Sequence, residues 1–267
     1  MKIITAFMIT FLALKCTNAS TKRGMCVGYK SYLCNDTQAF HGVSWWYDWS
    51  AVESTVKHSH CTNKPTGEFV PMFWGKTSLT LNTVPAGSHH VLGFNEPNHT
   101  KQSHMSPEKA AELWPALEKK AHGLKIISPA LAGCSNAQKC INWFTQFFEA
   151  CKNCRVDALA VHSYSCNVPH VIDAMKKISQ HFNKKIWLTE FACAPAKTEA
   201  QQLRFMSQIL PKLEASPYVE KYAWFMSRVL TNGTFINTSV NLLDIHTSTL
   251  TTLGKFYDSY KYPGLIG

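Results

Sequence analysis

Two glutamates stand at the ends of apolar runs, where a carboxylate is free to do chemistry. Residues 89–99, HHVLGFNEPNH, lead from an apolar segment into a polar tip that holds Glu96. Residues 184–193, KKIWLTEFAC, alternate with the two-residue period of a strand and hold Glu190 near their end. Pro97 cannot extend a hydrogen-bonded strand and favours an extended backbone at Glu96, so the first strand is expected to stop there. Two such carboxylates form a candidate acid–base pair, whereas a lone glutamate is usually solvated or ion-paired at the surface.

The rest of the chain predicts the scaffold that holds these glutamates. Eight short apolar runs alternate with helical or loop-like connections, which predicts an α/β fold with a parallel sheet closed into a single-domain (β/α)8 TIM barrel. The strand-like runs are 23–29, 42–49, 67–75, 89–96, 124–131, 155–164, 185–191 and 219–225, and helices are expected at 106–121, 137–150, 168–182, 198–214 and 249–260. The first connections are short and irregular.

The barrel gives both carboxylates a position. Glu96 ends the fourth strand and Glu190 ends the seventh, so both are expected on the C-terminal face, where barrel enzymes place catalysis. Two carboxylates from well-separated strands suit glycosidic cleavage, in which one protonates the leaving oxygen and the other attacks or activates water.

Aromatic and polar residues cluster at the other strand ends. Trp45, Trp46, Tyr47 and Trp49 lie at the second strand, Trp74 at the third, His162 and Tyr164 at the sixth, and Trp224 at the eighth. Sugars stack their C–H faces on aromatic rings, so a cleft lined by such residues fits a glycan. We expect Trp74 and Trp224 to be stacking platforms, ahead of Trp45 and Trp46, although any single tryptophan can simply be packed. His162 is either a site residue or a buried, hydrogen-bonded histidine.

The N-terminus has the features of a secretory signal peptide. Lys2, an apolar run over residues 3–14 and a small-residue exit predict cleavage after Ala19, which leaves residues 20–267 as the catalytic domain. The apolar run is too short to cross a bilayer, so we expect a secreted, extracellular monomer without membrane insertion. Removing Lys2 and Lys15 lowers the formal charge from +10 to +8, which favours anionic surfaces. The basic residues are scattered, so nucleic acid is not an expected partner.

Nine cysteines follow the signal segment, and secretion favours disulfides over metal sites. Zinc binding is an alternative to a disulfide only at Cys151-x-x-Cys154. No second pair of Cys or His residues at matching spacing is evident, so no metal is expected. Helix geometry separates Cys140 from Cys151 by about 16 Å, too far to bridge. The barrel then favours four pairs and leaves Cys26 as a buried free thiol. The pairs are Cys134–Cys140, Cys151–Cys154, Cys166–Cys193 and Cys34–Cys61.

Four N-x-[ST] sequons are present, at Asn35, Asn98, Asn232 and Asn237. A glycan at Asn98 would crowd the cleft beside Glu96. We expect Asn98 to be unmodified or to point outward and the other three to be the carriers.

An ordered set of motifs spans residues 22–260. It comprises KRGMCVGY, SWWYDWS, FVPMFWG, VLGFNEPNH, SPEKAAELWP, ISPALAG, CKNCRVDALAVHSY, WLTEFAC, KYAWFMSR and LLDIHTSTLTTLGKFYDSY. This set resembles glycoside hydrolase family 128, whose members are secreted (β/α)8 endo-β-1,3-glucanases.

The resemblance implies a role for each matched position. Glu96 would be the acid/base, Glu190 the nucleophile, Asn95 a ligand of the sugar 2-hydroxyl, and Trp74 and Trp224 stacking platforms. Two departures are visible: Ser163 stands where the family more usually has an aromatic residue, and residues 226–228, Met-Ser-Arg, replace smaller ones.

We therefore expect a retaining endoglucanase that cleaves internal linkages of β-1,3-glucan and needs no cofactor. One alternative is a noncatalytic secreted β-glucan-binding protein on the same barrel, which would not need both glutamates. Another is a secreted structural or host-interaction protein that uses its positive charge.

Overall fold

A computed structural model describes residues 20–53 and 60–263, so the expected signal peptide lies outside the described residues. Within them, no helix has both the length and the apolar composition needed to cross a bilayer.

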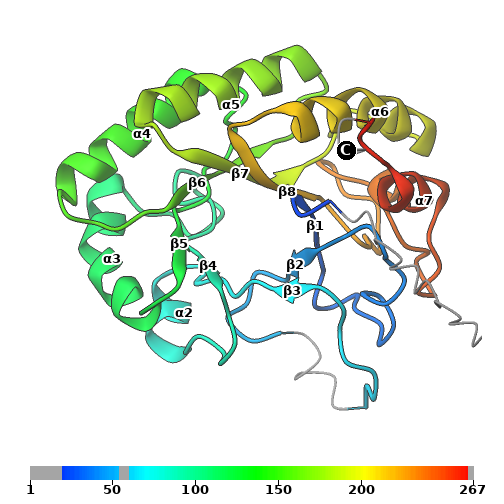
Figure 1. The fold of residues 1–267 in the computed structure, drawn as a ribbon, viewed down its shortest axis with the longest axis horizontal. Coiled ribbons are helices and arrows are strands. Elements are labelled where there is room, and N and C mark those ends of the chain that lie inside the picture. Colours follow the sequence, from blue (N-terminus) through cyan, green and yellow to red (C-terminus); the bar gives the residue numbers. More distant parts are fainter. Residues whose placement is uncertain (1–19, 54–59, 264–267) are drawn as a thin grey trace, which may run out of the picture.

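Eight parallel strands form one sheet that curls into a ring (Figure 1). They are β1 (Arg23–Cys26), β2 (Trp45–Tyr47), β3 (Glu68–Phe69), β4 (His90–Leu92), β5 (Lys125–Ile127), β6 (Ala158–Ser163), β7 (Lys185–Phe191) and β8 (Val219–Trp224). Their order in the sheet is β3-β2-β1-β8-β7-β6-β5-β4. Two backbone hydrogen bonds join the ends, from Leu92 N to Pro71 O at 2.9 Å and from Phe73 N to Leu92 O at 3.0 Å. The predicted (β/α)8 barrel is confirmed, and every strand lies inside its expected run.

The helices lie outside the strands (Figure 1). They are α2 (Lys76–Leu81), α3 (Pro107–Lys120), α4 (Ala137–Ala150), α5 (Val168–Phe182), α6 (Glu199–Ala215), α7 (Thr252–Ser259) and the short 3-10 helix η1 (Thr238–Val240). Local sequence sets their starts: Ser106 Oγ accepts a hydrogen bond from Lys109 N at 3.2 Å, and Pro107 occupies the first turn of α3. The five expected helices are present, whereas α2 was not predicted.

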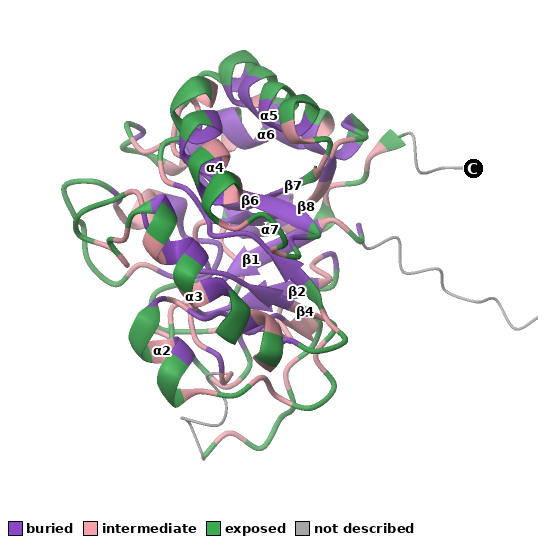
Figure 2. Ribbon diagram, turned by 90° about the vertical axis from the view of Figure 1, so that its left-hand side faces the viewer, coloured by how far each residue is buried: buried purple, intermediate pink, exposed green. Residues whose placement is uncertain are grey.

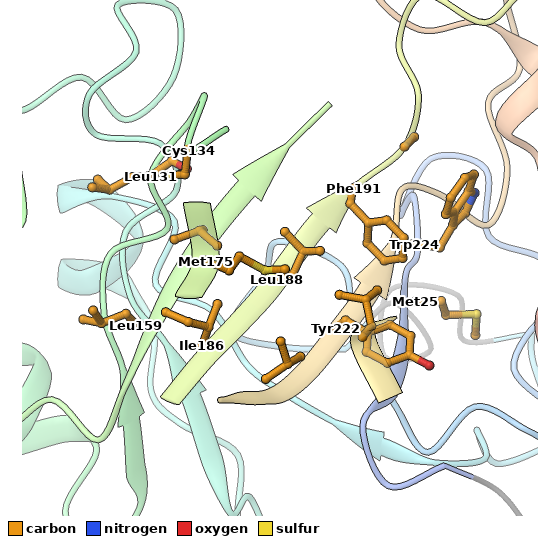
Figure 3. Close-up of a cluster of buried hydrophobic side chains, with 14 of the residues drawn as sticks. Met25, Leu131, Cys134, Leu159, Met175, Ile186, Leu188, Phe191, Tyr222 and Trp224 are labelled. Atoms are coloured by element: carbon orange, nitrogen blue, oxygen red, sulfur yellow. The ribbon is translucent and has the colours of Figure 1, made fainter. Parts of the chain in front are cut away.

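Buried apolar side chains form two layers, so the strands are buried on both faces while the outer faces of the helices are exposed (Figure 2). Alternation along β2 sends Trp45 and Tyr47 into the barrel and Trp46 into the outer layer. Figure 3 shows part of that outer layer, where Ile186 and Leu188 of β7 share a cluster with Met175 of α5.

In the part of the chain that the structure describes, four disulfides link loops and the two ends of α4. The predicted pairs Cys34–Cys61, Cys134–Cys140, Cys151–Cys154 and Cys166–Cys193 are all present. Cys26 is buried inside the barrel and is the free cysteine among the described residues, as expected.

Candidate active site

The segment that follows β4 carries Glu96 on a tightly held backbone. Gly93 permits close approach to the next strand's loop, because a Cβ there would lie 2.9 Å from Pro129 N. Glu96 N donates to Ala130 O at 2.8 Å, and Glu96 O accepts from His99 N at 2.9 Å. Glu96 has φ 42°, so the expected extended backbone is wrong: the turn closed by these bonds holds it in the left-handed region. For a non-glycine residue this conformation costs about 1–3 kcal/mol and is common at functional sites.

Glu96 and Glu190 meet at the C-terminal face of the barrel. One carboxylate oxygen from each, together with a ring nitrogen of His162, lie within 4.8 Å of one another. His162 Nδ1 is 2.8 Å from Glu96 Oε1 and 3.4 Å from Glu190 Oε2, and its Nε2 is 3.0 Å from Thr189 Oγ1. The histidine has no exposed surface and contacts both carboxylates, so it links them on the side away from solvent.

Aromatic donors hold the carboxylate of Glu190. Trp49 Nε1 donates to Oε1 at 2.8 Å, and the Tyr164 hydroxyl donates to Oε2 at 2.5 Å. The Tyr47 hydroxyl lies 3.5 Å from Oε1 and 2.9 Å from Thr189 O. Indole N–H is a donor only, so this set of partners stabilises an ionised Glu190.

Burial and neighbouring charges set the protonation of the three groups. Burial raises the pKa of Glu190, and the charge of Glu96 adds to this, while His162, Tyr164 and Trp49 oppose it without overcoming it. For Glu96, burial is outweighed by the hydrogen bond and the charge of His162, so its pKa lies below the usual value. Burial lowers the pKa of His162, but Glu190 and Glu96 outweigh it and the net shift is upward. Both directions favour the imidazole over Glu96 as the carrier of a proton that the two groups share.

An open cleft of about 900 Å³ lies above this pair. Its size falls within the range of small-molecule sites. The lining residues are Trp49, Trp74, Asn95, Glu96, Asn98, His99, Lys101, Gln102, Ala132, Gly133, Ser135, Lys139, Tyr164, Ser165, Glu190, Phe225, Met226 and Phe235. The two carboxylates thus lie in a cleft that combines aromatic and polar surfaces.

Two groups among the described residues have the spacing of metal ligands. In one, Cys34 and Cys61 are joined in a disulfide and offer no thiolate. The other is Glu96, His162 and Glu190, in which both ring nitrogens of His162 already have hydrogen-bond partners. A metal would have to displace these bonds, so the donor set fits an acid–base pair better than a metal centre.

Comparison with known proteins identifies the family of this chain. A family model described as the glycosyl hydrolase catalytic core matches residues 24–257. The chain belongs to this family. It is similar to the crystal structure of a family 128 (subgroup II) endo-β-1,3-glucanase from Sorangium cellulosum, with 32% identity, a TM-score of 0.78, and coverage of 91% of this chain and 99% of that chain.

Two further relatives extend the likeness. A family 128 (subgroup I) endo-β-1,3-glucanase variant from Amycolatopsis mediterranei, in complex with laminarihexaose, is 26% identical with a TM-score of 0.75, covering 90% of this chain and all of that chain. "Alkali-sensitive linkage protein 1" of Schizosaccharomyces pombe is 28% identical over 229 residues, which are 78% of this chain and 39% of that protein. This chain therefore spans about two fifths of the length of that relative. The resemblance to glycoside hydrolase family 128 is confirmed.

This glycosyl hydrolase core brings some of the expected site residues to the cleft. Trp74, Asn95 and Tyr164 line it, together with the two glutamates. His162 is not in the lining, but it contacts both glutamates, so it combines the two alternatives weighed for it: a buried histidine that belongs to the site.

Three of the expected sugar-binding tryptophans are not available for stacking. Trp45, Trp46 and Trp224 have no exposed surface and do not line the cleft, and a stacking platform needs an open face. Trp45 Nε1 donates to Lys22 O, before β1, which puts this ring at the N-terminal end of the barrel. Trp46 lies in the layer outside the strands. Trp224 packs against Phe191 in the same outer layer, with their ring centroids 5.1 Å apart (Figure 3).

Other aromatic residues replace them. Trp49, Phe225 and Phe235 line the cleft, and Phe235 is 58% exposed with its ring 4.8 Å from that of Tyr164. Trp49 stands two residues after Tyr47, so the two-residue period of the expected strand could have selected it, although in the structure it follows β2 with a φ of 60°. No sequence signal distinguishes Phe235, which lies on the loop after β8.

The two departures from the family pattern have different consequences. Ser163 is buried between His162 and Tyr164 and does not line the cleft. In residues 226–228, Met226 does line the cleft, whereas Arg228 is buried and forms a two-pronged ion pair with Asp36, with Nη1–Oδ2 2.6 Å and Nη2–Oδ1 2.8 Å.

Proposed function

We propose that this protein is a secreted retaining glycoside hydrolase that cleaves internal β-1,3-glucosidic linkages of glucans. Glu190 is the nucleophile and Glu96 the acid/base in this proposal. The observation that supports it most directly is the pair of buried carboxylates at the floor of an aromatic cleft. One oxygen of Glu96 lies within 4.8 Å of one oxygen of Glu190. Four disulfides support the secreted location.

An oxygen of Glu96 and an oxygen of Glu190 lie within 4.8 Å of each other, which is closer to the separation of a retaining pair than to that of an inverting pair. Retaining glycosidases separate their carboxyl groups by about 5–5.5 Å and inverting enzymes by about 6.5–9.5 Å, because inversion needs room for a water molecule. In the first step Glu190 attacks the anomeric carbon, the glycosidic C–O bond breaks, and Glu96 gives its proton to the leaving oxygen. In the second step Glu96 takes a proton from water, and that water releases the sugar from Glu190.

The hydrogen-bond partners of each carboxylate support this division of roles, whereas the net pKa shifts of the free site, upward for Glu190 and downward for Glu96, run opposite to it. Glu190 accepts hydrogen bonds from Trp49 and Tyr164, which favour the ionised form that a nucleophile needs. Glu96 has His162 as its partner, a group that holds and returns a proton. Glu96 becomes an acid when Nδ1 of protonated His162 passes its proton across the 2.8 Å contact to Oε1.

The cleft also has partners for a sugar. Asn95 Oδ1 is buried and has no hydrogen-bond partner within residues 20–53 and 60–263, so it can accept a bond from a sugar hydroxyl beside Glu96. Trp74, Phe225 and Phe235 offer ring faces to the C–H surface of a glucan. The named activity of the structural relatives, and the laminarihexaose in one of them, support β-1,3-glucan as the substrate.

Glutamate variants on two kinds of substrate test the proposal. Wild-type enzyme should release short oligosaccharides from laminarin with the β configuration first formed. Glu190→Ala should be inactive on every substrate, because the glycosyl-enzyme cannot form. Glu96→Ala should still cleave an aryl glycoside, whose leaving group needs no acid, and azide should accelerate it by attacking the intermediate.

Two results would contradict the proposal. Absence of product from laminarin would refute the substrate and favour a glycan-binding role. Initial products of inverted configuration, or identical behaviour of the two variants with azide, would refute the assignment of roles.

A further inference from the structure

The cleft has one charged wall that the cleavage of a neutral glucan does not require. His99 and Lys101 follow β4, and Lys139 lies in the first turn of α4, after β5; we call these three residues the basic wall. All three are exposed and line the cleft. The acidic residues in the lining are Glu96 and Glu190, at the floor.

The side-chain ammonium groups of Lys101 and Lys139 have no carboxylate partner among the described residues. Among the described residues, neither Lys101 Nζ nor Lys139 Nζ forms a hydrogen bond or an ion pair, whereas Lys109, Lys125, Lys177 and Lys221 each have a carboxylate within 4.0 Å. The side-chain hydrogen bonds to Glu96 and Glu190 come instead from His162, Trp49, Tyr164 and Tyr47. The lysines are therefore available to a ligand.

The backbone beneath the basic wall is fixed. Asn98 joins the loop after β4 to the loop after β5. Its Nδ2 donates to Ala132 O and its Oδ1 accepts from Ala132 N, both at 2.9 Å. Lys101 N donates to His99 Nδ1 at 3.1 Å, and Lys139 N donates to the capping Asn136 Oδ1 at 3.3 Å. The Cys134–Cys140 disulfide closes the loop that carries Lys139. The positive charges are thus presented on an ordered surface.

The opposite side of the cleft is apolar. Phe225, Met226 and Phe235 follow β8, which is four strands from β4 in the eight-stranded ring. A chain bound between the two sides would stack on the aromatic rings and turn one edge of its sugars toward the basic wall. Neutral hydroxyls gain little from two ammonium groups, while an anionic substituent gains a charge-assisted contact with each.

We propose that the basic wall recognises anionic substituents, such as carboxylate or sulfate groups, on a β-1,3-glucan chain. This inference rests on the proposed function and names a substrate class for the same cleft. One charge pair at 4 Å in a water-like dielectric corresponds to about a fivefold change in affinity, so two contacts give roughly 25-fold.

The test compares neutral laminarin with carboxymethylated and sulfated laminarin at low salt. The double variant Lys101→Met/Lys139→Met should lower the ratio of kcat/KM for the anionic over the neutral polymer by at least about tenfold. The matched control Lys119→Met/Lys255→Met removes the same charge from exposed sites outside the cleft and should leave the ratio unchanged. Salt near 0.5 M should abolish the wild-type preference, because it screens exposed charges.

An unchanged ratio in the Lys101/Lys139 variant, or an equal loss in the control, would overturn the inference. A preference for only one of the two modified polymers would support it and identify the substituent. Affinity electrophoresis through gels that contain each polymer separates this inference from the proposed function. Retardation by anionic laminarin that the double variant loses would support the basic wall even if no polymer is cleaved.

Discussion

Replacing Tyr164 by phenylalanine removes the closest hydrogen bond to Glu190 without changing the ring. The hydroxyl donates to Oε2 at 2.5 Å, the shortest contact of that oxygen, whose other close neighbour is His162 Nδ1 at 3.4 Å. The ring contacts with Phe225 at 5.4 Å and Phe235 at 4.8 Å remain in the variant. The substitution therefore isolates the effect of one donor on one carboxylate.

The lost bond has a predictable effect on the pKa of Glu190. Hydrogen bonds to charged groups contribute about 1.5–3 kcal/mol, so losing this one should raise the pKa of Glu190 further in the variant. The bond from Tyr164 lowers the pKa of Glu190, whereas burial raises it, so the removal acts in the same direction as burial. Because the nucleophile must be ionised, the acid limb of the pH profile should move to higher pH.

The assay is the pH dependence of kcat/KM on laminarin, which reports the ionisation of the free enzyme. Tyr218→Phe is the control: its hydroxyl donates to Ile172 O at 3.2 Å, a carbonyl that belongs to α5 rather than to the site. Both variants should unfold at similar temperatures, and only Tyr164→Phe should shift the acid limb. An acid limb that stays in place or moves to lower pH would refute the assignment of Tyr164 as the stabiliser of an ionised nucleophile.

Three further predictions concern stability and modification. Arg228→Met should destabilise the protein by about 3–5 kcal/mol in chemical denaturation, because it leaves Asp36 buried without its partner, and adding Asp36→Asn should recover part of this loss. Glu190→Gln should raise the thermal unfolding temperature near neutral pH but not near pH 4. The reason is that the folded pKa of Glu190 lies above the unfolded value, so ionisation costs stability as pH rises, and glutamine does not ionise. Intact-glycopeptide mass spectrometry should find Asn35, which is exposed, modified and Asn98 unmodified, because both polar atoms of the Asn98 side chain are bonded to the loop after β5.

The positions of the two glutamates follow from local sequence. Apolar alternation fixes where β4 and β7 run, and a parallel barrel brings all carboxyl ends of its strands to one face. The sequence therefore places Glu96 and Glu190 on the same face, while their contact through His162 depends on the closed barrel. Helix starts at Ser106 and Thr198 are equally local, because a capping side chain needs only the next turn of its own chain.

The identity of the cleft aromatics was decided by tertiary structure. Alternation gives Trp45, Tyr47 and Trp49 a common face, but it does not say how deep each residue lies, and of these three only Trp49 lines the cleft. Trp224 was expected in the cleft, but β7 and β8 pair with register shifts, which change the side to which a strand residue points.

The remaining features depend on contacts between distant segments. The left-handed backbone of Glu96 is held by a bond to the loop after β5, and Asp36 and Arg228 pair across 192 positions of sequence. Lys101 and Lys139 share one cleft because Asn98 joins their loops. Sequence patterns report the chain's own periodicity and capping, whereas these features exist only once the barrel has closed and brought their partners together.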